Sequence, residues 1–141
     1  MELELLELEQ KEIILDYATL HYEEPIVYIV FKADTQLGFP ETRELISCAE
    51  KLSNKKPYFI FSDVRANVEV TREGRRVAAD INEAPLHLGS AVLLNSNMLK
   101  LGVNFFNGFT TPVFPFRAFT DKQEAINWLL KLPTIPLKRN L

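Results

Sequence analysis

The sequence predicts an α/β protein in which a mixed β-sheet carries about four helices packed against it. Two observations support this fold class. Strand-like and helix-like segments alternate after an opening pair of strands, as crossover units do. Two segments, YFIFSDV (58–64) and SAVLLN (90–95), are continuous apolar runs, which is typical of strands covered on both faces. A length of 141 residues, 47% hydrophobic and 25% charged, fits one domain over 1–141.

The first third of the chain predicts an antiparallel hairpin and then a helix. The alternating residues 18–23 and the apolar residues 26–32 flank Glu24 and Pro25, as two strands flank a tight turn. Apolar residues then recur at helical spacing between Pro40 and Lys56, so a helix is expected there.

The middle of the chain predicts a second helix after the strand at 58–64. Thr71 is expected to cap a helix that runs to about Glu83. The small residues Gly74 and Ala78 lie on its apolar face, where they would let the helix lie close to the sheet.

The last third predicts a helix, an edge strand and a final helix. The third helix is expected over 98–109, and Pro115 would confine the strand at 113–119 to an edge because proline cannot donate to a ladder. The final helix is expected to open with a capping box from Thr120 to Gln123.

The two ends of the chain are less regular. Residues 1–11 alternate with a slip at Leu5 and Leu6, which favours a bulged strand or extension over a frayed helix. Residues 133–141 begin with Pro133, which stops the last helix, and are expected to form a loosely docked tail.

Composition argues against several classes of partner. A net charge of −3 and a pI near 5.4 provide no basic field for nucleic acid or an anionic membrane. The N-terminus is acidic and no apolar run is long enough to span a bilayer, so we expect a cytoplasmic protein without membrane insertion.

Cysteine and histidine give no metal or catalytic pattern. Cys48 is the single cysteine and shares a helical face with apolar residues, so we expect a buried thiol. His21 and His87 are isolated in the sequence, and we expect each to be a surface or loop residue rather than a ligand. No metal and no cofactor are expected.

The element order and the spacing after Asp63 resemble a known family. The central strand ends in Asp63, and VTREG (70–74) follows at the start of a helix. In this frame the chain resembles the STAS domain of sulfate transporters and anti-sigma-factor antagonists. It resembles in particular the uncharacterised SpoIIAA-like bacterial proteins, as do the segments KKPYFIFSDVR and LLNSNMLKLGVNFF. The resemblance covers about residues 18–132 and implies a SpoIIAA-like mixed sheet.

The same resemblance implies a degenerate phospho-switch at Thr71, Arg72, Glu73 and Gly74. The family turn reads as hydrophobic residue, Asp, Ser, Ser, Gly, and in the phosphorylatable branch the second serine is the kinase target. Arg72 and Glu73 stand in the two serine places here. Glu73 has no hydroxyl and carries one negative charge against roughly −1.5 to −2 for a phosphoserine, so no phospho-switch is expected.

Charged residues cluster around the predicted start of the second helix. They are Asp63, Arg65, Arg72, Arg75 and Arg76. Exposed amides and the helix dipole favour an anion at such a place, so an anion or partner contact is one interpretation. The other is a solvated helix face, since nearby acidic residues would neutralise the arginines.

The third predicted helix has an unusually broad apolar face. Its stripe and the adjoining aromatic position are Met98, Leu101, Phe105, Phe106 and Phe109. A helix this apolar needs cover on more than one side, which an aromatic core, a dimer surface or a ligand pocket would each provide.

The sequence as a whole favours a module that is not an enzyme. Asp63 follows a strand without an identified acid–base or nucleophile partner, so it is interpreted as structural. We expect a regulatory or interaction module with an unidentified protein partner, forming a homodimer. The alternative is a carrier or sensor of a small apolar or lipid-like ligand that binds the Phe-rich segment 98–119.

Overall fold

The protein is built on a six-stranded sheet, and the computed structural model describes residues 11–100 and 114–135. The strand order is β1-β2-β3-β5-β7-β8. The strands are β1 (Glu12–Ile14), β2 (Ala18–Glu23), β3 (Ile26–Phe31), β5 (Tyr58–Asp63), β7 (His87–Leu93) and β8 (Phe116–Phe119). β1, β2 and β3 pair antiparallel, and the remaining pairs are parallel. The mixed α/β sheet and its opening antiparallel hairpin are therefore as predicted.

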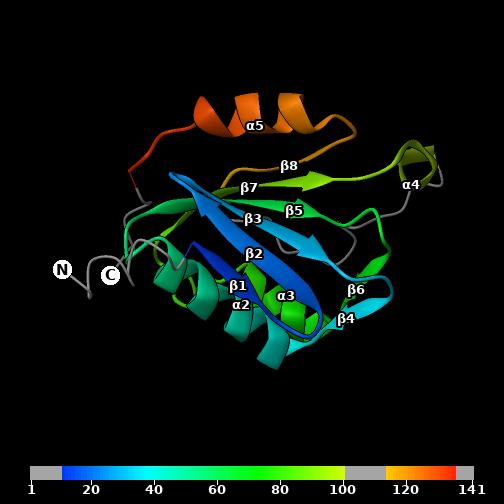
Figure 1. Ribbon diagram of the computed structural model, residues 1–141, viewed down its shortest axis with the longest axis horizontal. Coiled ribbons are helices and arrows are strands. Elements are labelled where there is room, and N and C mark those ends of the chain that lie inside the picture. The colour runs from blue at the N-terminus through cyan, green and yellow to red at the C-terminus, as the bar shows by residue number, and fades with distance from the viewer. Residues whose placement is uncertain (1–10, 101–113, 136–141) are drawn as a thin grey trace.

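Helices cover both faces of this sheet (Figure 1). α2 (Phe39–Leu52) and the short α3 (Arg72–Ala78) lie on one face, and α5 (Lys122–Leu130) lies on the other. α4 (Ser96–Lys100) follows β7. The described part of the chain thus has the four predicted helices, in the predicted order.

Two apolar clusters fill the space between the sheet and its helices. The larger lies between the sheet and α2, where Leu45, Ala49 and Leu52 line up at helical spacing against strand residues such as Leu20 and Val27. The smaller lies under α5 and contains Ala125 and Leu129 with residues of β3, β5 and β7. The parallel strands therefore have one core on each face, as their continuous apolar sequences predicted.

A second, two-stranded sheet joins the segments that lead into α2 and α3. β4 (Thr35–Leu37) and β6 (Val68–Val70) pair in parallel. A Cβ added to Gly74 would lie 2.5 Å from the Leu37 carbonyl oxygen and 3.2 Å from Thr42 Oγ1. The close approach predicted for Gly74 is confirmed, but α3 approaches β4 and α2 rather than the main sheet.

Two local predictions about helix ends were wrong. α3 stops at Ala78 instead of continuing to Glu83, because Asp80 Oδ1 accepts a hydrogen bond from the Asn82 amide at 2.8 Å and turns the chain. α5 is capped by Asp121, whose Oδ1 accepts from the Glu124 amide at 3.0 Å, and not by a box from Thr120 to Gln123.

Several predictions fall partly or wholly outside the described residues. They are the strand over 1–10, the continuation of the helix over 101–109, and the tail beyond residue 135. Pro115 lies just before β8, which is an edge strand of the main sheet as predicted, and the Pro115 carbonyl accepts from the Ser90 amide at 2.9 Å.

Candidate functional site

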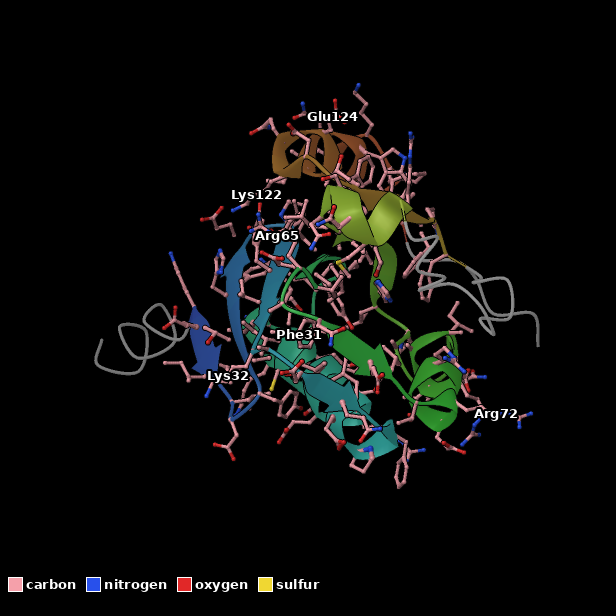
Figure 2. All side chains as sticks on the ribbon, turned by 90° about the vertical axis from the view of Figure 1, so that its right-hand side faces the viewer. Phe31, Lys32, Arg65, Arg72, Lys122 and Glu124 are labelled. Atoms are coloured by element: carbon pink, nitrogen blue, oxygen red, sulfur yellow. The ribbon has the colours of Figure 1, made fainter. Side chains whose placement is uncertain are left out.

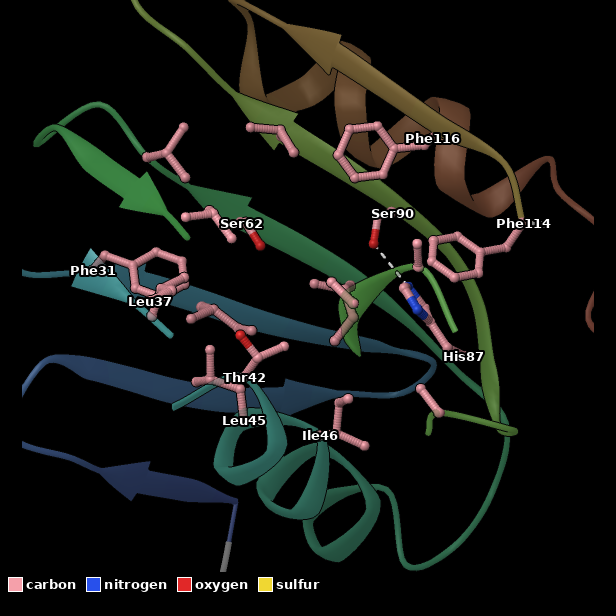
Figure 3. A pocket seen from close by; sticks show the side chains of 18 of the residues that line it. Phe31, Leu37, Thr42, Leu45, Ile46, Ser62, His87, Ser90, Phe114 and Phe116 are labelled. Carbon is pink, nitrogen blue, oxygen red and sulfur yellow. Dashed lines mark hydrogen bonds between the residues drawn. The ribbon is translucent and has the colours of Figure 1, made fainter. Parts of the chain in front are cut away.

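An apolar cavity of about 130 Å³ lies between the main sheet and the α2–α3 layer (Figure 3). β3, β5, β7 and β8 supply one wall, and α2 with the end of α3 supplies the other. The lining includes Ile46 on α2, Ala78 and Ala79 at the end of α3, Tyr58, Ser62, His87 and Ser90 on the strands, and Phe114 and Phe116. Among the described lining residues none is Asp, Glu, Lys or Arg.

The strand register places two hydroxyl groups on the cavity wall. Ile60 of β5 pairs with Ser90 of β7, and Ser90 pairs with Phe116 of β8. One row further along, Ser62 pairs with Val92. Because side chains two residues apart on a strand share a face, Ser62 and Ser90 are diagonal neighbours on adjacent strands. Figure 3 shows both on the cavity side of the sheet.

His87 lies in this cavity, which corrects the prediction of a surface or loop residue. Its ring lies between Tyr58, with ring centroids 5.8 Å apart, and Phe114, with centroids 4.0 Å apart. Nε2 lies 2.7 Å from Ser90 Oγ and 3.1 Å from the Gly89 carbonyl oxygen. Burial lowers the pKa of His87 to about 4, although the Gly89 carbonyl acts in the opposite direction. The imidazole is therefore neutral at pH 7.

The Gly89 carbonyl favours one of the two neutral tautomers of His87. A carbonyl oxygen can only accept, so the 3.1 Å contact favours the neutral tautomer in which Nε2 carries the N–H. Nε2 then donates to both Gly89 O and Ser90 Oγ, and the Ser90 hydroxyl keeps its own proton for another acceptor.

This tautomer bears directly on catalysis, since a serine 2.7 Å from a histidine nitrogen has the spacing of a nucleophile and its base. To act as base, Nε2 would have to lose its proton and turn a lone pair toward the Gly89 oxygen. No carboxylate of the described residues bonds to the His87 ring to orient it. In this tautomer the Ser90 hydroxyl can direct its own proton into the cavity.

Asp63, interpreted from the sequence as structural, bonds to the turn that follows β5. Asp63 accepts hydrogen bonds from the Arg65 amide at 3.1 Å and from the Arg65 guanidinium at 3.0 and 2.7 Å. Burial would raise the pKa of Asp63, but these hydrogen bonds and the charges of Arg65 and Lys122 hold it below its usual range. The carboxylate is thus an ionised turn residue, paired and not poised for proton transfer.

The predicted charged cluster does not come together as one site. Arg65 is engaged by Asp63 and lies near Lys122, whereas Arg72, the first residue of α3, lies well apart from both (Figure 2). Arg75 donates to the Val70 carbonyl at 3.2 Å and is half-buried. Within the part of the chain that the structure describes, the exposed Arg72, Glu73 and Arg76 have no hydrogen-bond or ion-pair partner.

Thr71 caps α3, as predicted. It accepts from the Gly74 amide at 3.1 Å, so its hydroxyl oxygen is engaged with the backbone. Glu73 is exposed in the first turn of α3, where its charge complements the helix dipole.

The Phe-rich segment is described only at its two ends. Met98 is half-buried and packs against the larger core, while Leu101, Phe105, Phe106 and Phe109 lie outside the described residues. At the other end, Phe114 and Phe116 line the apolar cavity, and Phe119 packs against Trp128 with centroids 5.6 Å apart. The aromatic positions that can be placed thus divide between the cavity and the α5 core.

Sequence reasoning missed the cavity itself. The available signal was one hydroxyl inside each apolar run, Ser62 in YFIFSDV and Ser90 in SAVLLN, with His87 just before the second run. A polar residue inside a strand covered on both faces needs a partner or a cavity.

Two further absences hold for the described residues. No helix there is long and apolar enough to cross a membrane. No group of three His, Cys, Asp or Glu side chains is arranged to hold a metal ion.

These features define an α/β domain with a mixed sheet and an apolar cavity under one helical layer. The chain belongs to the family described as a domain of unknown function, DUF7793, which matches residues 20–133. It is also similar to the crystal structure of an uncharacterised DUF3478-family protein with a SpoIIAA-like fold from Shewanella loihica PV-4. The identity is 17%, the match covers 79% of this chain and 91% of that chain, and the TM-score is 0.48. No curated protein matches the chain.

Proposed function

We propose that the protein is a non-catalytic module that binds a small apolar molecule, as a sensor or carrier. The observation that carries this proposal is the cavity of about 130 Å³ with a largely apolar lining. An unfilled apolar cavity of this size destabilises the fold, because its walls lack packing partners. A bound apolar molecule would restore those contacts. The site differs from the ligand site inferred from sequence, which was the segment 98–119 as a whole.

The small size of several wall residues supports binding over simple imperfect packing. Ala78, Ala79 and Ala84 line the helical side where larger apolar residues would fill the space. On the strand side the hydroxyls of Ser62 and Ser90 stand where valine would pack better. An apolar cavity with a few convergent polar groups is the usual form of a small-molecule site.

The proposal that the module is non-catalytic rests on the same geometry. His87 donates through Nε2 toward Gly89 and Ser90, and Asp63 is held by Arg65 outside the cavity lining. Neither group is arranged as a general base toward the cavity.

Native mass spectrometry of the full chain tests the binding function. After incubation with an apolar extract of the producing cells and gel filtration, we expect a mass increment of one small molecule on the wild type. Ile46 lines the cavity, so Ile46→Phe should abolish the increment by filling it. Ile14→Phe is the matched control, since Ile14 is 72% exposed on β1. An unmodified mass for the wild type would contradict the proposal.

A protein partner at the start of α3 is the second candidate, favoured by the exposed and unpaired Arg72, Glu73 and Arg76 of the described chain. Affinity at this place would be set by charge pairs and not by a phosphate, because Thr71 is engaged as a cap and Glu73 has no hydroxyl. Arg72→Glu should weaken such a complex, whereas Lys51→Glu on α2 should leave it unchanged. The predicted homodimer and the cytoplasmic location stay predictions, and the same native spectra report the dimer mass.

A further inference from the structure

Resting on the proposed function, we infer that the cavity selects an uncharged ring compound bearing one oxygen, such as a phenol. The ring would lie among the aromatic side chains and the oxygen would meet the hydroxyls of Ser62 and Ser90. The inference is carried by the size of the cavity, its lack of charge and the direction of its hydroxyl donors.

The size of the cavity fits a single six-membered ring. Its volume is about 130 Å³, and an engineered protein cavity of roughly 150 Å³ lined by aliphatic and aromatic residues binds benzene. A long acyl chain or a nucleotide would extend well beyond this volume. The rings of Tyr58, Phe114 and Phe116 on the wall favour an aromatic guest, since offset or edge-on ring pairs add to simple apolar burial.

The electrostatics of the lining favour a neutral guest. No Asp, Glu, Lys or Arg is among the described lining residues, and His87 is neutral because burial lowers its pKa to about 4. A carboxylate or ammonium group placed here would lose its hydration without gaining an opposite charge, which is strongly unfavourable. Asp63, which lies between the lining residues Ser62 and Val64 in the sequence, is paired with the Arg65 guanidinium.

The hydroxyl groups favour a guest that accepts a hydrogen bond. Ser90 Oγ already accepts from His87 Nε2, so its proton is available to the cavity. Ser62 lines the cavity on the adjacent strand, and within the described residues it has no hydrogen-bond partner. A single ligand oxygen between them would satisfy both groups, and a purely hydrocarbon guest would leave them unpaired.

The test compares three probes of similar ring size, namely phenol, toluene and benzoate, on the full-length protein. Dissociation constants come from shifts of the methyl NMR signals of Ile60 and Val92, which line the cavity. We expect phenol to bind more tightly than toluene, and benzoate not to bind. We expect Ser90→Ala and Ser62→Ala each to weaken phenol by about fivefold, the effect of one neutral hydrogen bond, and to leave toluene unchanged.

The matched control is Ser47→Ala, because Ser47 is exposed on the outer side of α2. Using two separate serines keeps the test valid if one variant is too unstable to measure. Equal changes for phenol and toluene, or tighter binding of benzoate than of phenol, would overturn the inference while leaving a small-molecule site in place. If neither phenol nor toluene shifts the cavity methyl signals, both this inference and the proposed function are wrong.

Discussion

His87 is a polar side chain held in a largely apolar environment. Its ring is enclosed by Tyr58 and Phe114, and its Nε2 proton is divided between the Gly89 carbonyl and the Ser90 hydroxyl. Such an environment solvates the neutral imidazole well and the imidazolium poorly, which is why burial lowers the pKa of His87 to about 4.

The first prediction follows from this pKa. As the pH falls, the unfolded chain takes up a proton on this histidine near pH 6.5, while the folded protein does so only near pH 4. The free energy of unfolding therefore decreases between those two values, by up to about 3 kcal/mol, and this contribution is fully present only above about pH 6.5. Urea unfolding of the wild type and His87→Gln between about pH 7 and about pH 4 measures the difference between the two proteins.

The difference between the two proteins isolates His87, because other titrating groups are common to both. His21→Gln is the matched control, since that ring stacks on Tyr28 at the opposite face of the sheet. Parallel stability curves for wild type and His87→Gln would show that the ring is more accessible to a proton than this geometry implies.

At the scale of elements, helix starts are decided by a single side-chain oxygen. Both Thr120 and Asp121 are residue types that cap helices, and they stand next to each other before α5. The structure selects Asp121, which has extended backbone angles and accepts from the Glu124 amide at 3.0 Å. A carboxylate also interacts more favourably with the helix dipole than a hydroxyl does.

The second prediction separates these two caps. Asp121→Ala should lower the free energy of unfolding by about 1 kcal/mol, because an amide of the first turn loses its acceptor. Thr120→Ala should change it by less than about 0.5 kcal/mol, since Thr120 is exposed and outside the cap. Urea unfolding at neutral pH compares the two variants, and a larger loss for Thr120→Ala would reassign the cap.

Elements with enough residues to show a period were predictable from the sequence. The order of strands and helices from β2 to α5 follows from such patterns. β4 and β6 were not predictable because each has three residues, too few to show alternation, and each pairs only with the other. The early end of α3 was missed because the turn made by the Asp80 side chain competes with an apolar helical pattern that continues to Ile81.

The candidate site was predictable only in its local parts. Thr71 and Asp63 act on neighbours a few residues away, so their roles follow from short sequence patterns. The cavity brings together residues from Ile29 to Phe116, and its size depends on how α2 and α3 are seated on the sheet. That seating is a property of tertiary packing, which no local pattern contains.

At the scale of the whole molecule, the cavity arises from how α3 is held. Gly74 docks α3 against the Leu37 carbonyl, and Arg43 of α2 makes two hydrogen bonds to Glu83 beyond α3, at 3.3 and 2.8 Å. α3 and the turn after it are thus attached to α2 and β4 instead of being pressed onto the sheet. The three alanines at 78, 79 and 84 then face the strands without filling the space between.

The last prediction tests this space without any ligand. Eliminating an empty cavity of about 130 Å³ on unfolding corresponds to about 80 mL per mole, within the range of roughly 20 to 100 mL/mol by which unfolding shrinks proteins. Because the lining is largely apolar, we expect the cavity to hold little water, so high pressure should unfold the wild type readily. Ile46→Phe should make the volume change on unfolding less negative by a few tens of mL/mol, roughly in proportion to the space filled. Pressure unfolding followed by Trp128 fluorescence measures this change, with Ile14→Phe as the control of equal chemistry at an exposed site. Equal volume changes for the wild type and Ile46→Phe would mean that water fills the cavity. A ligand would then have to displace that water in order to bind, instead of entering an empty apolar space.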